Sequence, residues 1–210
     1  TMKVIVVGTE YTGKTTLVNA LQKWGMERGI RHHMDDHFTI PDQQTLKDRS
    51  DQMAMLNAPE PIKERFQRFQ IAYHVRLVNN YQHVLLVGFH IEEVVYGPRY
   101  YYPKLGRGVE NPQSWEKDMP KDIILVLLTA DPDVIKSRME NDPHVFPVVP
   151  GTDVEEVQAA FQTEFRRSFF KQKFHIDTSK LTEETLLQEF MDASFTHLSA
   201  ADHLIRQAKP

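Results

Sequence analysis

The stretch Lys3-Val4-Ile5-Val6-Val7-Gly8-Thr9-Glu10-Tyr11-Thr12-Gly13-Lys14-Thr15-Thr16 decides the fold of this chain. Its first half is a β-branched run that ends in glycine, which is typical of a strand buried on both faces of a parallel sheet. Its second half leads into a helical pattern whose apolar face is Leu17, Ala20, Leu21 and Trp24. The stretch therefore predicts a strand, a glycine loop and a helix in direct succession.

The loop within this stretch, residues 8–15, matches the pattern G-x-x-x-x-G-K-[ST] in full. Backbone N–H groups of such a loop, together with the helix N-terminus, form a site for the β-phosphate of a nucleoside triphosphate. In this pattern Lys14 reaches the β- and γ-phosphates, and the Thr15 hydroxyl binds Mg²⁺. We expect the nucleotide to be bound by Gly8, Thr9, Glu10, Tyr11, Thr12, Gly13, Lys14, Thr15 and Thr16.

Further strands and helices alternate along the rest of the chain. Strand patterns lie at residues 30–34, 84–88, 123–128 and 174–177. Helical patterns lie at residues 43–81, where Pro59 and Pro61 divide the segment, at 131–139, at 154–170 and after the capping box at 182–185. This alternation predicts an α/β fold, a three-layer sandwich with a five-stranded parallel sheet.

Length and composition predict one domain spanning residues 1–210, since 210 residues with 40% apolar content suffice for one sizeable core. Prolines punctuate a segment at about residues 139–152, which we expect to form a lid between two helices. The absence of cysteine excludes disulfides, thiolate zinc sites and cysteine nucleophiles, and fits a reducing compartment.

The net charge of −4 disfavours a nucleic-acid partner, although it leaves a local basic groove open. No apolar run approaches the roughly 20 residues of a membrane helix. We therefore expect a soluble, cytoplasmic protein without a membrane partner.

The remaining motifs narrow the phosphate chemistry. A GTPase needs an N-K-x-D signature, which neither residues 127–130 nor residues 177–180 supply. A motor ATPase needs an apolar strand that ends in Asp, whereas the run at 84–88 ends in glycine. These exclusions favour a small-molecule phosphotransferase.

On the glycine loop and on residues 90–97, 129–138 and 176–179, the chain resembles the P-loop nucleoside and nucleotide kinases, especially the thymidylate kinase-like and deoxynucleoside kinase-like branches. The resemblance implies a P-loop NTPase fold of the nucleotide-kinase type. It also implies transfer of phosphate from ATP, with Mg²⁺, to a nucleoside, a nucleotide or a related small molecule. Arg138 matches the arginine that packs on adenine in this family, and its alternative is an ordinary exposed helix arginine.

The chain departs from this family at the end of the third strand. Most members carry Asp-Arg or Glu-Arg where this sequence has Val87-Gly88. In the lid, His144 is the one potential cation between Arg138 and Gly151, so Arg166 and Arg167 of the next helix are candidates to reach in. Two alternatives to a small-molecule kinase therefore stay open: a catalytically impaired ATP-binding protein, and a kinase acting on a nucleic-acid end or modified base.

Asp35 and Asp36 follow the predicted second strand, where open α/β sheets place their ligand crevice. The resemblance implies that such a carboxylate removes a proton from a hydroxyl acceptor, so both are candidate catalytic residues beside Lys14. Asp36 is also a candidate magnesium ligand beside Thr15. The alternative for the pair is a solvated loop with a capping role.

The resemblance also implies an acceptor site along the helix that contains Phe69, Gln70 and Tyr73. The Gln70 amide can both donate to and accept from a base, whereas core packing explains the aromatic side chains equally well. Of the acids Glu92 and Glu93, we expect one to start a helix and the other to face the pocket.

The segment at residues 96–102 is rich in tyrosine and also contains Arg99. It is a candidate to close over a nucleobase or a nucleic-acid strand, and the alternatives are loop packing or a contact within a homodimer. The candidate substrate-binding residues are thus Phe69, Gln70, Tyr73, Glu92, Tyr96 and Arg99.

Overall fold

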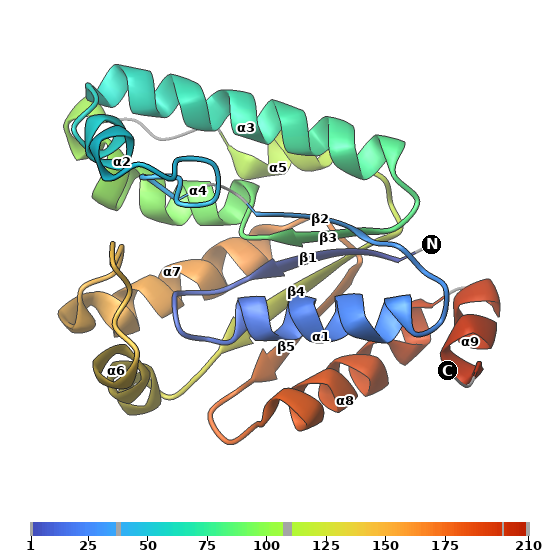
Figure 1. The fold of residues 1–210 in the computed structure, drawn as a ribbon. Helices are drawn as coiled ribbons and strands as arrows, with labels where there is room; N and C mark the ends of the chain where they lie inside the picture. Colours follow the sequence, from blue (N-terminus) through green and yellow to red (C-terminus); the bar gives the residue numbers. More distant parts are fainter. Residues whose placement is uncertain (1, 37–38, 107–110, 199, 209–210) are drawn as a thin grey trace.

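A computed structural model describes residues 2–36, 39–106, 111–198 and 200–208. Its centre is a sheet with the strand order β2-β3-β1-β4-β5, in which every neighbouring pair is parallel (Figure 1). The strands are β1 (Lys3–Val7), β2 (His33–Asp36), β3 (Val84–Val87), β4 (Ile123–Thr129) and β5 (Gln172–Asp177). The predicted α/β fold with a five-stranded parallel sheet is confirmed.

Helices cover both faces of this sheet (Figure 1). One layer contains α1 (Lys14–Met26) and α8 (Glu183–Ser194), and the other contains α3 (Glu60–Asn80), α4 (His90–Tyr96) and α7 (Val154–Arg167). The remaining helices are α2 (Arg49–Leu56), α5 (Pro112–Glu116), α6 (Pro132–Asn141) and α9 (Ala200–Gln207). None of the described helices is both long and apolar enough to span a membrane.

The sheet separates two apolar cores, because successive residues of a strand point to opposite faces. In β1, Ile5 and Val7 belong to the core beneath α3, α4 and α7. Val4 and Val6 belong to the core beneath α1 and α8. Burial of both faces explains the unbroken β-branched run that predicted this strand.

The second strand lies later in the sequence than predicted. β2 covers His33–Asp36, not residues 30–34, and pairs with β3 from His33 opposite Val84 to Asp36 opposite Val87. Its sequence is polar because it is an edge strand held by backbone pairing, so apolar periodicity could not locate it. As a result, Asp35 and Asp36 lie within the strand and point to opposite faces of the sheet.

The tyrosine-rich segment packs inside the molecule. Residues 97–101 form a π-helical turn, and Tyr96, Tyr101 and Tyr102 are buried. Tyr96 packs edge-on against Phe161 of α7, with their ring centroids 5.4 Å apart. Loop packing therefore accounts for most of this segment.

Replacing Phe161 by alanine tests this packing. Because Phe161 is fully buried and Phe169 is exposed, Phe161→Ala should lower the free energy of unfolding by about 3–5 kcal/mol. The matched variant Phe169→Ala should change it by less than about 1 kcal/mol. Denaturant unfolding of both variants measures the difference, and equal losses would contradict this description of the core.

Candidate functional site

A cleft of about 860 Å³ opens beside the glycine loop, at the carboxyl end of the sheet. Its walls come from the loop itself, the end of β2, α4, α6, the lid segment and the loop after β5. The lining residues are Glu10, Tyr11, Gly13, Lys14, Thr15, Thr16, Asp36, Thr39, Gln43, Val87, Glu92, Tyr96, Arg138, Asn141, Asp142, Pro143, His144, Val145, Phe146, Thr178, Leu181, Thr182, Glu183 and Leu186.

Two glycines allow the backbone conformation of the glycine loop. Gly8 has φ +146°, and a Cβ there would lie 2.3 Å from the Leu128 carbonyl oxygen of β4. Gly13 has φ +90° and precedes the first turn of α1. The Thr12 hydroxyl closes the loop by donating to the Thr9 carbonyl at 2.8 Å.

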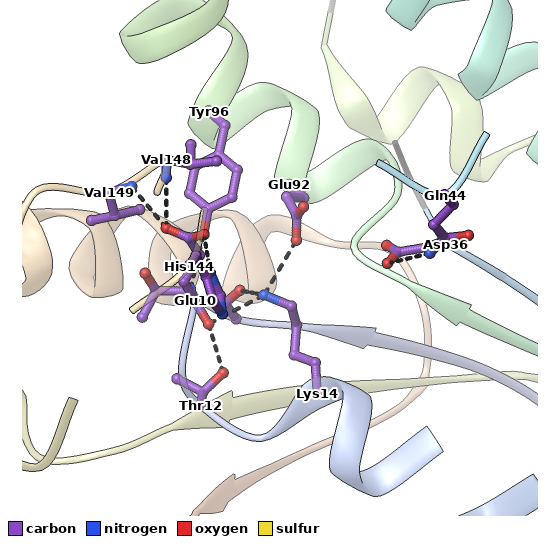
Figure 2. A network of polar contacts seen from close by, with 12 residues as sticks. Glu10, Thr12, Lys14, Asp36, Gln44, Glu92, Tyr96, His144, Val148 and Val149 are labelled. Carbon is purple, nitrogen blue, oxygen red and sulfur yellow. Dashed lines mark hydrogen bonds and ion pairs between the residues drawn. The ribbon is translucent and has the colours of Figure 1, made fainter. Parts of the chain in front are cut away.

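Lys14 points back across this loop (Figure 2). Its Nζ donates to the Gly8 carbonyl at 2.5 Å and to the Thr9 carbonyl at 3.2 Å. Glu92 Oε2 of α4 lies 3.4 Å from the same nitrogen. The ammonium is therefore held at the mouth of the loop by two carbonyls and one carboxylate.

Gly88 provides the room for the Glu92 carboxylate. A Cβ on Gly88 would lie 2.7 Å from Glu92 Oε2 and 3.0 Å from Oε1, and Gly88 has φ +79°. At the end of β3 this chain lacks the carboxylate found in the kinases that the sequence resembles. The small Gly88 there leaves room for the carboxylate of Glu92, from the first turn of α4. Glu92 faces the cleft, whereas Glu93 accepts a hydrogen bond from the Tyr102 hydroxyl in the core.

Asp36 lies across the cleft from the loop. Burial and the neighbouring Glu92 carboxylate raise the pKa of Asp36 to about 7, although the charge of Lys14 acts in the opposite direction. Gln44 Nε2 donates to Asp36 Oδ2 at 3.3 Å (Figure 2). A carboxyl group with this pKa can exchange a proton near neutral pH.

The structure does not bring Asp35 to the cleft. Its Oδ2 lies 3.7 Å from Nε2 of His74, a buried residue of α3 on the opposite face of the sheet. Burial acts to raise the pKa of Asp35, but the charge of His74 and a hydrogen bond from the Asp36 backbone N–H hold it below its ordinary value. The two aspartates, both candidate catalytic residues, are thus separated by the alternation of side chains along the strand.

Arg138 joins the glycine loop to the loop after β5. Its Nη1 donates to the Tyr11 carbonyl at 2.7 Å, and its Nη2 donates to the Thr178 carbonyl at 2.9 Å. Arg138 lines the cleft together with Leu181 and Leu186, which lie at the end away from Asp36. The side chain is therefore more than an exposed helix arginine.

The lid segment, residues 139–152, contacts two consecutive residues of the glycine loop. Glu10 Oε2 accepts hydrogen bonds from Val148 N at 2.9 Å and from Val149 N at 2.8 Å (Figure 2). Glu10 Oε1 accepts from His144 Nδ1 at 2.9 Å, and Tyr11 Oη accepts from His144 N at 2.8 Å. Sequence reasoning placed Glu10 in the loop but missed this contact, since the pattern leaves that position unspecified.

Several predicted acceptor-site residues do not line the cleft. Phe69 and Tyr73 lie on the exposed side of α3, where their exposed fractions are 65% and 47%. The fully buried glutamine of α3 is Gln67, three residues before Gln70. Arg99 lies 3.6 Å from Glu156 of α7 and also donates to a backbone carbonyl of α4.

Arg166 and Arg167 do not reach the cleft either. They lie in the last turn of α7, which leads into the start of β5 and thus lies at the amino end of the strands, opposite the carboxyl end where the glycine loop lies. Arg167 pairs with Glu164 at 3.0 Å, and Arg166 donates to Thr163. The direction of the helix, which the sequence pattern did not specify, explains this outcome.

Replacing Gly88 by alanine tests the coupling between the strand end and Glu92. The left-handed φ alone should cost about 1–2 kcal/mol, and the contact with the Glu92 carboxylate should add to that cost. Gly29→Ala is the matched control, because Gly29 has φ +74° and open space around its Cβ position. Denaturant unfolding should show a larger loss for Gly88→Ala, and equal losses would mean that Glu92 moves aside without cost.

No protein-family model matches this sequence, and no curated protein matches it in sequence.

Solved structures do match the fold. The YorR protein of Bacillus subtilis, in complex with phosphorylated GDP, superposes with a TM-score of 0.61 at 13% identity over 94% of this chain and 99% of its own. The deoxyadenosine kinase of M. mycoides with bound dATP gives 0.59 at 12% identity over 91% and 98%. The same enzyme with bound dCTP gives 0.58 at 11% identity over 93% and 100%. The chain therefore has the P-loop kinase fold that these proteins share.

Proposed function

We propose that this protein is an ATP- and Mg²⁺-dependent phosphotransferase that acts on a hydroxyl group of a nucleoside or a related small molecule. The observation that carries the proposal is the single cleft in which Lys14 of a complete glycine loop lies beside Glu92 and shares the lining with Asp36. The dATP bound to the deoxyadenosine kinase of M. mycoides supports nucleotide binding in this fold.

The donor nucleotide would occupy the end of the cleft between the glycine loop and the loop after β5. Backbone N–H groups of the loop would bind the phosphates, and Lys14 would bind the β- and γ-phosphates. Leu181 and Leu186 offer apolar contact for a base, and Arg138 lies beside them. Arg138 would stack on the adenine as it does in the kinases that the sequence resembles.

The acidity of the cleft supports a role for Mg²⁺. Five carboxylates belong to its lining, those of Glu10, Asp36, Glu92, Asp142 and Glu183. Magnesium prefers oxygen ligands and often keeps several waters, so Thr15, with Asp36 or Glu92, forms a donor set that suits it. A bound Mg²⁺ would offset the charge of the triphosphate.

The acceptor side favours a hydroxyl group over a phosphate. Apart from Lys14, the described residues on this side are Thr39, Gln43, Val87, Tyr96 and the acids Asp36 and Glu92, which include no cation. A monophosphate acceptor would meet repulsion there, whereas a hydroxyl can donate to Asp36. As the acceptor oxygen bonds to the γ-phosphorus, Asp36 would take its proton and the bond from the γ-phosphorus to the bridging oxygen of ADP would break.

A screen of nucleosides, nucleoside monophosphates and oligonucleotides with Mg·ATP tests the proposal. We expect product from a nucleoside or another neutral hydroxyl compound. Tight ATP binding without any product would instead identify a nucleotide-binding protein that lacks transfer activity. Product from oligonucleotides alone would identify a nucleic-acid end, and not a small molecule, as the phosphate acceptor.

Lys14→Ala should weaken ATP binding and abolish turnover without unfolding the protein, because, among the described residues, the ammonium contacts two loop carbonyls and Glu92 beside the cleft and no residue of either apolar core. Lys23→Ala, on the exposed side of the same helix, is the matched control and should leave both unchanged. Calorimetric titration with Mg·ATP measures the affinity. Unchanged ATP affinity in Lys14→Ala would contradict the proposal that the glycine loop binds the phosphates of ATP.

Asp36→Asn should lower the rate about a hundredfold or more, the usual effect of losing a general base. It should also stabilise the protein at high pH. Because the pKa of Asp36 is raised from 3.8 to about 7, the folded state binds the proton more tightly than the unfolded state does. The wild-type protein therefore loses stability as the pH rises from about 4 to about 7, where the folded carboxyl group must ionise. The gain in Tm should therefore be larger at pH 8 than at pH 4.

Asp35→Asn is the matched control for Asp36→Asn. The pKa of Asp35 is lowered, so its carboxylate contributes stability above its unfolded pKa, and this variant should lose Tm at pH 8. Its rate should fall much less than that of Asp36→Asn. Equal rate losses in the two variants would contradict the separation of roles by strand face.

A further inference from the structure

His144 is the lid residue that the glycine loop holds most closely. Its Nδ1 donates to Glu10 Oε1 at 2.9 Å, and its backbone N–H donates to Tyr11 Oη at 2.8 Å. Its ring also stacks on Tyr11, with centroids 4.1 Å apart and planes 18° apart. Three contacts with two adjacent residues therefore fix both the place and the tilt of the imidazole.

The same contacts determine which ring nitrogen is available to a ligand. A carboxylate can only accept hydrogen bonds, so Nδ1 carries a proton and is occupied by Glu10. Nε2 is then the nitrogen left for a molecule in the cleft, which His144 lines with a side chain that is 44% exposed. If Nε2 faces an anionic oxygen, the ring donates from both nitrogens, as an imidazolium does.

The cleft has few positive charges to offer a triphosphate. Among the described lining residues, only Lys14, Arg138 and His144 can be cationic. The guanidinium of Arg138 donates to the carbonyls of Tyr11 and Thr178. His144 is thus the second cationic side chain, after Lys14, that can turn a donor toward phosphate.

The position of His144 along the cleft indicates which part of a nucleotide it meets. Its partner Glu10 lies within two residues of Gly8 and Thr9, whose carbonyls bind the Lys14 ammonium. That ammonium marks the β- and γ-phosphate end of the loop. The end expected to bind adenine is the one at Arg138, which binds the Thr178 carbonyl of the loop after β5.

We propose, building on the proposed function, that His144 Nε2 donates a hydrogen bond to the terminal phosphate of the bound triphosphate. Glu10 is the positioning residue that sets the ring by binding Nδ1 while its other oxygen binds the N–H groups of Val148 and Val149. The lid segment thereby supplies a cation at the transferring group through a histidine, in the absence of an arginine between residues 139 and 152.

Nucleotide affinity tests this contact without needing the acceptor. In His144→Gln, affinity for the Mg²⁺ complex of the non-hydrolysable ATP analogue AMP-PNP should fall about 10- to 100-fold, the usual range for a charge-assisted hydrogen bond. Affinity for Mg·ADP, which lacks the terminal phosphate, should change less than about twofold. His144→Arg should recover part of the loss, and Glu10→Gln should show a smaller loss that is again confined to AMP-PNP.

The matched control is His33→Gln. His33 also stacks on a tyrosine, Tyr81, with centroids 4.1 Å apart and planes 16° apart, but it starts β2 at the amino end of the strands, opposite the end where the glycine loop lies. This variant should bind both nucleotides as the wild type does.

Two results would overturn the inference alone: His144→Gln with unchanged affinity for both nucleotides, or with an equal loss for both, which would mean that His144 only packs the lid. Wild-type protein that binds neither nucleotide would overturn the proposed function, and the inference with it.

Discussion

The contact between the Lys14 ammonium and the Glu92 carboxylate, at 3.4 Å, is the interaction on which the site depends. Both groups are largely buried, with side-chain exposures of 11% and 5%, and a buried charge is costly unless it is paired. Burial and the charge of Glu92 raise the pKa of Asp36, so one carboxylate both pairs with the lysine and favours the protonated form of Asp36. Gly88 makes this possible, since any side chain there would displace Glu92.

The alternation of side chains along the edge strand β2 places the two aspartates on opposite faces of the sheet. Asp36 faces the cleft with a raised pKa, whereas Asp35 faces α3 and pairs with His74. The ionised carboxylate of Asp36 costs stability and that of Asp35 contributes it, as follows from the opposite directions of their pKa shifts. A slip of one residue in the pairing with β3 would exchange the faces on which Asp35 and Asp36 lie.

Sequence patterns predicted the elements whose cause is local. The β-branched runs marked the central strands, and the capping box at Thr182 and Thr185 marked the start of α8. They failed where the cause is tertiary. The phase of α3 turns Gln67 inward and Phe69 outward, which composition and spacing do not specify. The sequence predicts that one of Glu92 and Glu93 faces the pocket, and Glu92 does so. Its contact with Lys14 depends on the left-handed φ of Gly88 and Phe89, which no sequence pattern specifies.

The glycine-loop pattern specifies its glycines, lysine and threonine and leaves the intervening positions free. In this protein two of the unspecified positions, Glu10 and Tyr11, bind the segment at residues 139–152. Tyr11 has a left-handed φ of +64°, which is unfavourable for a residue with a side chain. Residues 139–152, the segment predicted to form a lid, are thus attached at their middle to the glycine loop, as well as at their two ends. Any displacement of this segment from the loop would break the hydrogen bonds of Glu10, so one carboxylate couples the position of the segment to that of the loop.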